Sequence, residues 1–184
     1  MFTRKATAKA HSLVLRHGYS GASVRMLAKE IGSSTHEIYE VFGGKGQFIK
    51  SLLAYEQTIL DEMQLQVEGD TPQEVLKSWF DQIYNFQVQE GSPRGFLFVN
   101  LACQFSDGDE ELRRNVAHVH NTNIKWISSV VGRIKRNDGS PGDREIANFI
   151  LATVAGSILL AVADRDYWEL SNGLSRLKEY VDNI

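Results

Sequence analysis

Four hydrogen-bonding side chains share one face of a short helix that the sequence predicts near the N-terminus. Thr35, His36, Tyr39 and Glu40 recur at intervals of three and four residues, which brings side chains together on a helix. They offer donors and acceptors, but no nucleophile in the chain stands at a recognised spacing from a base. The chemistry indicated by this row is recognition of a polar surface, such as the base edges in a DNA groove.

Two short helices joined by a tight turn are predicted to position this row. Ser23 is a natural N-cap, and apolar residues recur at helical spacing over residues 24–31 until Gly32 ends the helix. Ser34, followed three residues later by Glu37, has the sequence of a capping box and begins the second helix. A helix this short is not stable alone, so packing must hold it in place.

The second helix has an apolar side behind its polar one. Ile38 and Phe42 lie four residues apart and can bury one stripe against the rest of the domain. A helix that is held from behind and polar in front is what a helix-turn-helix places in the major groove of DNA. We therefore expect DNA recognition by this helix pair.

At these residues the chain resembles the tetracycline-repressor (TetR) family of bacterial transcription factors. The resemblance covers about the first fifty residues. It rests on the Gly18-Tyr19 pair, on the run ASVRMLAKEIG, and on five later residues that fall in the family's order and spacing, which are Ile38, Tyr39, Phe42, Lys45 and Phe48. It implies an all-α fold with an N-terminal helix-turn-helix domain. It also implies an inducer pocket in the middle of the chain and a dimer interface formed by the last two helices.

We expect two kinds of DNA contact. Thr35 and His36 face base edges, whereas Tyr39 and Lys45 are placed to touch phosphates. The whole expected DNA-binding set is Ser23, Arg25, Ser34, Thr35, His36, Tyr39 and Lys45. The carboxylate of Glu40 would repel phosphates unless it pairs with His36 one turn earlier or accepts a hydrogen bond from a cytosine amino group.

Charge is segregated along the chain. Residues 1–50 hold eight basic and three acidic side chains, a net charge of +5, whereas the whole chain carries −3 and the remainder −8. The basic end therefore coincides with the helix-turn-helix. This arrangement favours attraction of phosphates at one end of the protein.

The composition is that of an ordinary globular protein. The 184 residues are 42% hydrophobic and 23% charged, which suits one good core or two small ones that share a helix. The single cysteine excludes an internal disulfide, and the first residues show no signal-peptide pattern. The longest apolar run, Phe149 to Ala163, has fifteen residues and is too short for a membrane span. We expect a cytoplasmic protein with no membrane contact.

The remaining sequence is helical in pattern, with no sustained alternation of the kind that strands show. We expect an all-α fold of about nine helices. A helix-turn-helix DNA-binding domain would cover residues 1–48, and a helical regulatory and dimerisation domain would cover residues 49–184. The expected helices after the motif include residues 47–67, 96–105, 143–163 and 169–184.

The two C-terminal helices predict a partner chain. Apolar residues occupy every side of the helix over residues 143–163, so it must be buried on more than one face. Gly156 and its small neighbours would let another helix approach closely, and residues 169–184 carry a matching apolar stripe. We expect a homodimer joined through a four-helix bundle. The alternative is a helix that is central to its own domain.

The middle of the chain concentrates aromatic residues beside His and Asn. Most aromatic residues at helical spacing belong to the core, and the residues alone do not establish a pocket. The inducer pocket is implied by the family resemblance, and the residues that we expect to line it are Trp79, Tyr84, Phe98, Phe105, His118 and Trp126. The expected ligand is small and largely apolar.

Other chemistry has little support. His118 and His120 are two residues apart and face opposite sides of a helix, so they cannot share a metal ion. Residues 43–46 lack the spacing of a phosphate-binding loop, and we expect no cofactor. Cys103 fits a buried, unreactive thiol on an apolar helix better than it fits the redox sensors of some TetR-family members.

Two functions remain open at the level of sequence, and neither is an enzyme. The first is a transcriptional regulator, in its commonest form a repressor, that binds a palindromic operator as a homodimer and is released by an inducer. The second is a helical interaction or ligand-binding protein whose helix-turn-helix binds DNA weakly or not at all. Glu40 is the residue that keeps the second alternative open.

Overall fold

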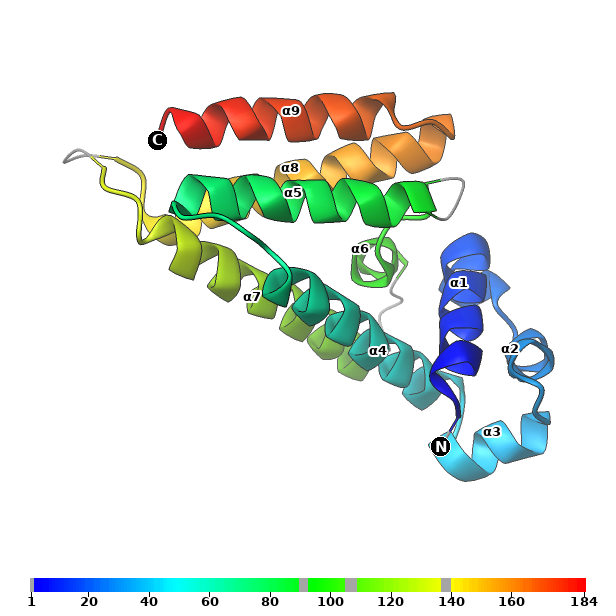
Figure 1. The fold of residues 1–184 in the computed structure, drawn as a ribbon. Coiled ribbons are helices and arrows are strands. Elements are labelled where there is room, and N and C mark those ends of the chain that lie inside the picture. The colour runs from blue at the N-terminus through cyan, green and yellow to red at the C-terminus, as the bar shows by residue number, and fades with distance from the viewer. Residues whose placement is uncertain (1, 90–92, 105–108, 137–139) are drawn as a thin grey trace. The chain divides into compact units, whose positions relative to one another are not determined.

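The computed structural model describes residues 2–89, 93–104, 109–136 and 140–184. Its described residues form nine α-helices and no strand, which confirms the expected all-α fold (Figure 1). The helices are α1 (Arg4–Gly21), α2 (Val24–Ile31), α3 (Thr35–Phe42), α4 (Lys45–Leu65), α5 (Pro72–Gln89), α6 (Leu97–Ala102), α7 (Glu110–Val131), α8 (Asp143–Asp164) and α9 (Trp168–Asp182). Phe105, which we expected inside the sixth helix and in the pocket, lies outside the described residues.

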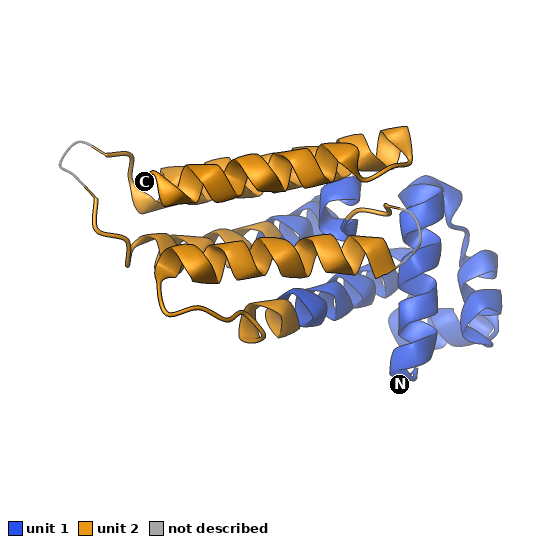
Figure 2. Ribbon diagram, turned by 45° about the horizontal axis from the view of Figure 1, so that its top comes forward, with its two compact units in different colours: residues 1–60, 96–119 blue, residues 61–95, 120–184 orange. Residues whose placement is uncertain are grey.

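Two compact units share these helices (Figure 2). Unit 1 comprises residues 1–60 and 96–119, and unit 2 comprises residues 61–95 and 120–184. Both α4 and α7 contribute residues to each unit. The expected functional division after residue 48 stays a prediction. In the structure, α6 and the start of α7 belong to the same compact unit as the helix-turn-helix, and α6 packs on α1.

Unit 1 has a core built from the apolar faces of its short helices. Leu13 and Val14 of α1, Leu27 of α2 and Ile38 of α3 are all buried. A cluster of three rings closes the end of this core, where Phe42 lies 4.8 Å from Phe48 and 5.8 Å from Phe2 between ring centroids. Because α2 and α3 are only eight residues long, this packing is what stabilises them.

In unit 2, α9 packs against α5 and α8. The approach of α8 to α9 is close: a Cβ atom placed on Gly173 would lie 2.8 Å from the Cβ atom of Ser157. Glycine at position 173 is therefore required by the close packing of the two helices and not by its backbone conformation. Lys178 of α9 and Asp81 of α5 form an ion pair between these helices.

Helix α8 ends within one residue of the helix that the sequence predicted over residues 143–163. The sequence showed an apolar run of fifteen residues, but the helix has 22 residues and a mean hydropathy of 2.2 over its most apolar window. By length and composition it could cross a membrane, and it is the one such helix among the described residues. Core helices of soluble proteins meet the same criterion, and one side of α8 is indeed buried against α9.

Candidate nucleic-acid interface

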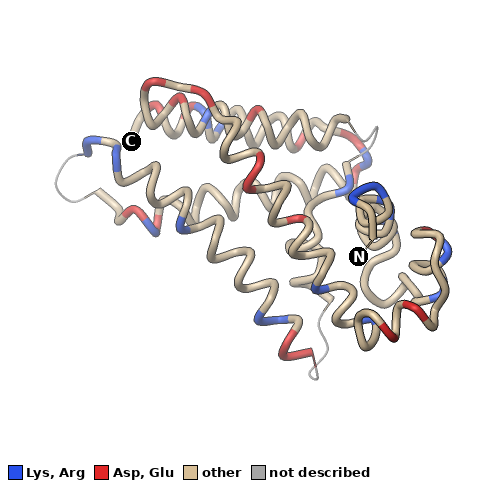
Figure 3. The backbone as a smooth tube through the Cα atoms, turned by 60° about the horizontal axis from the view of Figure 1, so that its bottom comes forward, with Lys and Arg blue, Asp and Glu red and all other residues tan. Residues whose placement is uncertain are grey.

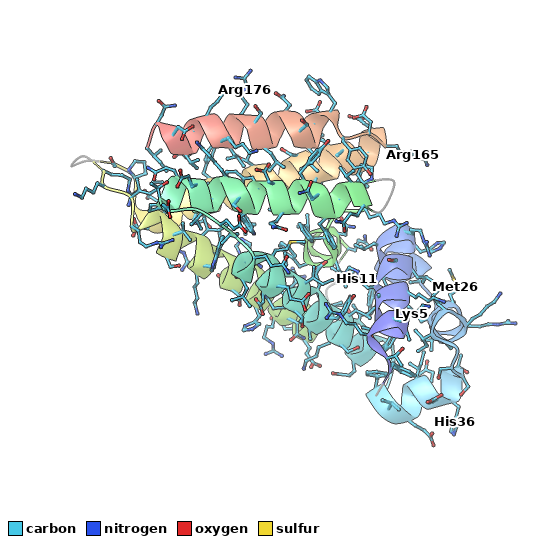
Figure 4. All side chains as sticks on the ribbon, in the orientation of Figure 1. Lys5, His11, Met26, His36, Arg165 and Arg176 are labelled. Atoms are coloured by element: carbon cyan, nitrogen blue, oxygen red, sulfur yellow. The ribbon has the colours of Figure 1, made fainter. Side chains whose placement is uncertain are left out.

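Helix α3 exposes the four side chains that the sequence placed on its polar face. Thr35, His36, Tyr39 and Glu40 are all exposed, whereas Ile38 on the opposite side is completely buried. His36 projects from α3 in Figure 4. The predicted exposed polar face is confirmed, and of the predicted apolar stripe Ile38 is buried and Phe42 is half-buried.

His36 and Glu40 pair with each other. His36 Nε2 lies 3.2 Å from Glu40 Oε1, and the two side chains are 80% and 64% exposed. Of the two roles that the sequence left open for Glu40, the free protein adopts pairing with His36. In this arrangement the imidazole ring can donate a hydrogen bond to the carboxylate that would otherwise face phosphates alone.

Two serine hydroxyls cap the helices of the motif. Ser23 Oγ accepts a hydrogen bond from Met26 N at 3.2 Å, and Ser34 Oγ accepts one from Glu37 N at 3.1 Å. The expected reciprocal half of the capping box at Ser34 is not formed, and the Glu37 carboxylate accepts a hydrogen bond from the Ser33 hydroxyl instead. Each capping hydroxyl keeps its own proton, so Ser23 and Ser34 are still able to donate to a phosphate.

Basic charge near the motif lies beside α3 and not on it. Arg25 and Lys29 are exposed on α2, whereas α3 contains two glutamates and no lysine or arginine. Figure 3 shows the same separation, with blue on α1 and α2 and red on α3. Electrostatic attraction of a phosphate backbone must therefore come from the helices that flank α3.

Lys45 has a partner that the sequence did not reveal. Its ammonium donates to the backbone carbonyl of Tyr19 and lies 4.6 Å from the centre of the Tyr19 ring. Partial burial lowers the pKa of the Lys45 side chain. The expected phosphate contact of Lys45 stays a prediction, and it would have to use the ammonium protons that the Tyr19 carbonyl leaves free.

The residues expected to line an inducer pocket fall into different units. In unit 2, the rings of Trp79 and Trp126 lie 5.4 Å apart, while the half-buried Tyr84 contacts Tyr167 at 6.4 Å. Phe98 is buried in unit 1 beside Phe96, and His118 is exposed in the same unit. Among these residues the structure brings Trp79 and Trp126 together.

The expectation of a buried thiol at Cys103 is wrong. Cys103 follows the last residue of α6 and is exposed. The apolar run that suggested burial ends one turn earlier than expected, because α6 stops at Ala102. The next residue, Gln104, accepts a hydrogen bond from the backbone N–H of Tyr19 through its side-chain oxygen.

Unit 1 also has an apolar hollow that the sequence analysis missed. It has a volume of about 660 Å³ and lies where the start of α1, the end of α3 and α4 meet. Phe2, Val41, Phe42, Phe48 and Tyr55 are among its lining residues. Phe2 precedes the first helix, so helical periodicity could not assign it to this cluster.

We compared the chain with protein-family models, curated proteins and solved structures. No protein-family model matches the chain. A curated relative from Lactococcus lactis subsp. lactis, an uncharacterised helix-turn-helix-type transcriptional regulator in the lacX 3′ region, is 22% identical over 187 residues, 98% of this chain and 93% of the relative.

Solved structures share the fold over almost the whole chain. A TetR-family transcriptional regulator from Agrobacterium tumefaciens matches with a TM-score of 0.83 and 18% identity, covering 96% of this chain and 95% of that one. A cysteine variant of the TetR-family regulator CifR, solved with 26 bp double-strand operator DNA, matches with a TM-score of 0.77 and 18% identity, covering 97% and 96%. The chain has the fold of TetR-family transcriptional regulators.

Proposed function

We propose that this protein is a ligand-responsive transcriptional regulator of the TetR family that acts in the cytoplasm. Two copies bind a palindromic operator through α3, and a small, largely apolar inducer releases them, so that the protein works as a repressor. The proposal joins three parts: a DNA-binding surface, a dimer interface and a ligand site. Each rests on a different group of described residues.

The observation that carries the DNA-binding part is the exposed face of α3. Ile38 anchors the helix and Ser34 caps it, so the short helix holds Thr35 and His36 outward in fixed positions. Such side chains can reach base edges in a major groove, while Arg25 on α2 supplies charge for the backbone. CifR, which shares the fold, was solved with operator DNA, and this supports operator DNA as the partner of this chain.

The dimer part rests on the outer face of α8. Phe149 and Leu160 are 49% and 53% exposed, and Leu159 is exposed beside them. Ala152 and Gly156 lie between these residues at helical spacing, and a Cβ atom on Gly156 would meet nothing within 4 Å. A large apolar face with small residues at its centre favours close contact with another helix, and a second copy of α8 has the complementary shape.

A two-fold dimer also fits the DNA target. Two recognition helices related by a two-fold axis read two inverted half-sites, so the operator should be palindromic. The centres of the half-sites would lie about 34 Å apart or a multiple of that distance.

The inducer part is supported by the contact between Trp79 and Trp126. The Trp79 side chain is buried, and its Nε1–H has no hydrogen-bond acceptor among the described residues. Buried donors are normally satisfied, so an apolar ligand with one hydrogen-bond acceptor would suit this position. Binding would regulate DNA affinity if the ligand preferred the conformation that fits the operator poorly.

The alternative function is a helical interaction or ligand-binding protein with weak or lost DNA binding. Two carboxylates on α3 and the absence of a basic residue there favour it. Under this alternative, α8 would still dimerise and the tryptophan pair would still bind a ligand, so neither property separates the two functions.

DNA retention separates them. The purified protein is mixed with the promoter region of its own gene in a gel-shift assay at several salt concentrations, with Thr35→Ala as the matched variant. We expect a shift that weakens as salt rises and a weaker shift for the variant. No shift at low salt, or equal shifts of the promoter and random DNA, would favour the alternative.

A further inference from the structure

A buried carboxylate in unit 1 connects three helices. Glu56 of α4 is completely buried, and its two oxygens accept three hydrogen bonds. His11 Nε2 of α1 donates at 3.1 Å, Phe98 N of α6 donates at 2.9 Å, and Leu97 N of α6 is the third donor. Two of these donors come from one helix and the third from another, so this single side chain fixes both helices to α4.

The carboxylate performs a task that α6 cannot perform itself. The first N–H groups of a helix have no partner within it, and the N-cap residue Phe96 has no side chain able to accept from them. Glu56 accepts from the N–H groups of Leu97 and Phe98 instead. The first turn of α6 therefore depends on a residue from another helix.

The imidazole of His11 is held as firmly as the carboxylate. His11 is 4% exposed, and its ring packs edge-on against Tyr55 with 5.6 Å between centroids. It lies on the side of α1 that faces α4 and α6 (Figure 4). Because α1 packs directly on α2, a shift of α1 at His11 would be passed to the helix-turn-helix.

A second bond connects α1 with the other end of α6. Gln104, two residues after α6, accepts from the backbone N–H of Tyr19 at 2.6 Å. Tyr19 also receives Lys45 at its carbonyl, so this end of α1 is tied to the start of α4 as well. The start of α6 is therefore bonded to α4, and the segment after its end is bonded to α1.

The first turn of α6 cannot move without a penalty. If Leu97 and Phe98 withdrew, Glu56 would keep one of its three donors inside an apolar core. A buried charge that loses its hydrogen-bond partners is costly, so the core would rearrange until the carboxylate found new ones. His11 would be able to move with it, since both belong to the same hydrogen-bond network.

We propose that Glu56 is a positioning residue through which the position of α6 controls the helix-turn-helix. With α6 seated on Glu56, His11 holds α1 and the motif in the operator-binding arrangement. Any event that draws the first turn of α6 away from Glu56 releases His11 and weakens operator binding. This inference rests on the proposed function, because it assumes that the protein binds an operator.

The first test is Glu56→Gln, which keeps the size of the side chain but places an amide N–H₂ against backbone or imidazole donors. We expect operator affinity to fall about tenfold, which is within the usual range of coupling between sites. The dependence of affinity on salt should keep its slope, because no phosphate contact is removed. A merely structural residue would lower the thermal midpoint without this selective loss.

Glu74→Gln is the matched control. Glu74 also accepts hydrogen bonds at a helix start, from the N–H groups of Asp70 and Thr71 before α5, but it is exposed and belongs to unit 2. We expect operator affinity within twofold of wild type. An equal loss from both variants would mean that the effect of Glu56→Gln is general destabilisation, and the inference would be wrong.

Variants of His11 carry the test if Glu56→Gln does not fold. His11→Gln keeps a donor that can reach the carboxylate, whereas His11→Leu removes it. We expect His11→Gln to bind the operator better than His11→Leu. Equal affinity of these two variants would overturn the role of the His11 bond.

Hydrogen exchange at Leu97 and Phe98 reads the state of the network directly. In Glu56→Gln both amides should exchange faster, and in the wild type operator DNA should slow them, because coupling is reciprocal. If the amides exchange faster in Glu56→Gln while operator affinity equals that of wild type, the inference is wrong and the proposed function stands. If wild type retains no DNA at all, the proposed function fails first.

Discussion

Helices α3 and α8 each have one face fixed by their own unit and one face that this chain leaves exposed. On α3 the exposed face offers a hydroxyl, an imidazole, a phenol and a carboxylate, whereas on α8 it offers Phe149, Leu159 and Leu160. The buried faces of the two helices are both apolar, which shows only that each helix packs against its own unit. The exposed faces differ, and the difference indicates the class of partner.

The physical reason lies in what each face loses when it is covered. The groups on α3 give up water and must regain hydrogen bonds, which base edges and phosphates can supply. The residues on α8 gain free energy simply by leaving water, about 25 cal/mol for each Å² of apolar surface. A nucleic acid therefore suits the first face, and another protein chain suits the second.

The largest expected effect is at Gly156. Replacement by glutamate should abolish the dimer, since an uncompensated charge at a dry interface costs about 3–5 kcal/mol. The fold of the single chain should persist, because nothing lies within 4 Å of a Cβ atom at this position. Sedimentation velocity measures the oligomeric state, and circular dichroism measures helix content.

Gly173→Ala is the control for this experiment. Its added methyl group would collide with Ser157 inside unit 2, so it should lower the thermal midpoint of the protein. A stable monomeric wild type at micromolar concentration would contradict the assignment of α8 to dimerisation. So would a Gly156→Glu variant that sediments like wild type.

The next effect is at Thr35. Thr35→Ala should weaken binding to the operator by about 1 kcal/mol or more and leave binding to random DNA unchanged, because a base contact is lost while phosphate contacts remain. Fluorescence anisotropy with both duplexes measures the two affinities. Equal losses on the two duplexes would show that α3 does not read bases.

Arg25 should behave in the opposite way. Arg25→Ala should weaken operator and random DNA about equally and lower the slope of log affinity against log salt by about 1. Lys45→Ala should lower the same slope only if the ammonium reaches a phosphate despite its bond to Tyr19. An unchanged slope for Lys45→Ala would assign that residue to positioning α1 and not to DNA.

The smallest expected effect concerns pH and Glu74, at the start of α5. Hydrogen bonds from Thr71 and Asp70 lower the pKa of Glu74, so its ionised form stabilises the folded state. This contribution is present above the unfolded-state pKa and is lost as pH falls through the folded-state pKa. Glu74→Gln should therefore flatten the decline of the thermal midpoint in acid. An identical decline in wild type and variant would contradict it.

Local signals predicted the motif well because they depend on neighbouring residues. The caps at Ser23 and Ser34, the turn at Gly32 and the apolar stripe through Ile38 were all readable from spacing, and the structure has them. The starts and ends of the long helices were displaced by a few residues because no single residue fixes them.

Long-range contacts were not readable in the same way. The bonds of Lys45 to Tyr19 and of Glu56 to His11 join residues 26 and 45 positions apart, and no local pattern reports such a distance. One signal was available for Glu56: it lies one turn from Leu52 and Leu53 and one turn from Leu60, on the buried stripe of α4. A charged residue on an apolar stripe predicts a buried polar partner.

Selection of random-sequence duplexes by the purified wild-type protein tests the central claim most directly. We predict enrichment of an inverted repeat whose half-site centres are about 34 Å apart, that is 10–10.5 bp, or a multiple of this distance, because α3 reads DNA twice in a two-fold dimer. Enrichment of no motif, or of a single motif without its inverted partner, would contradict the account.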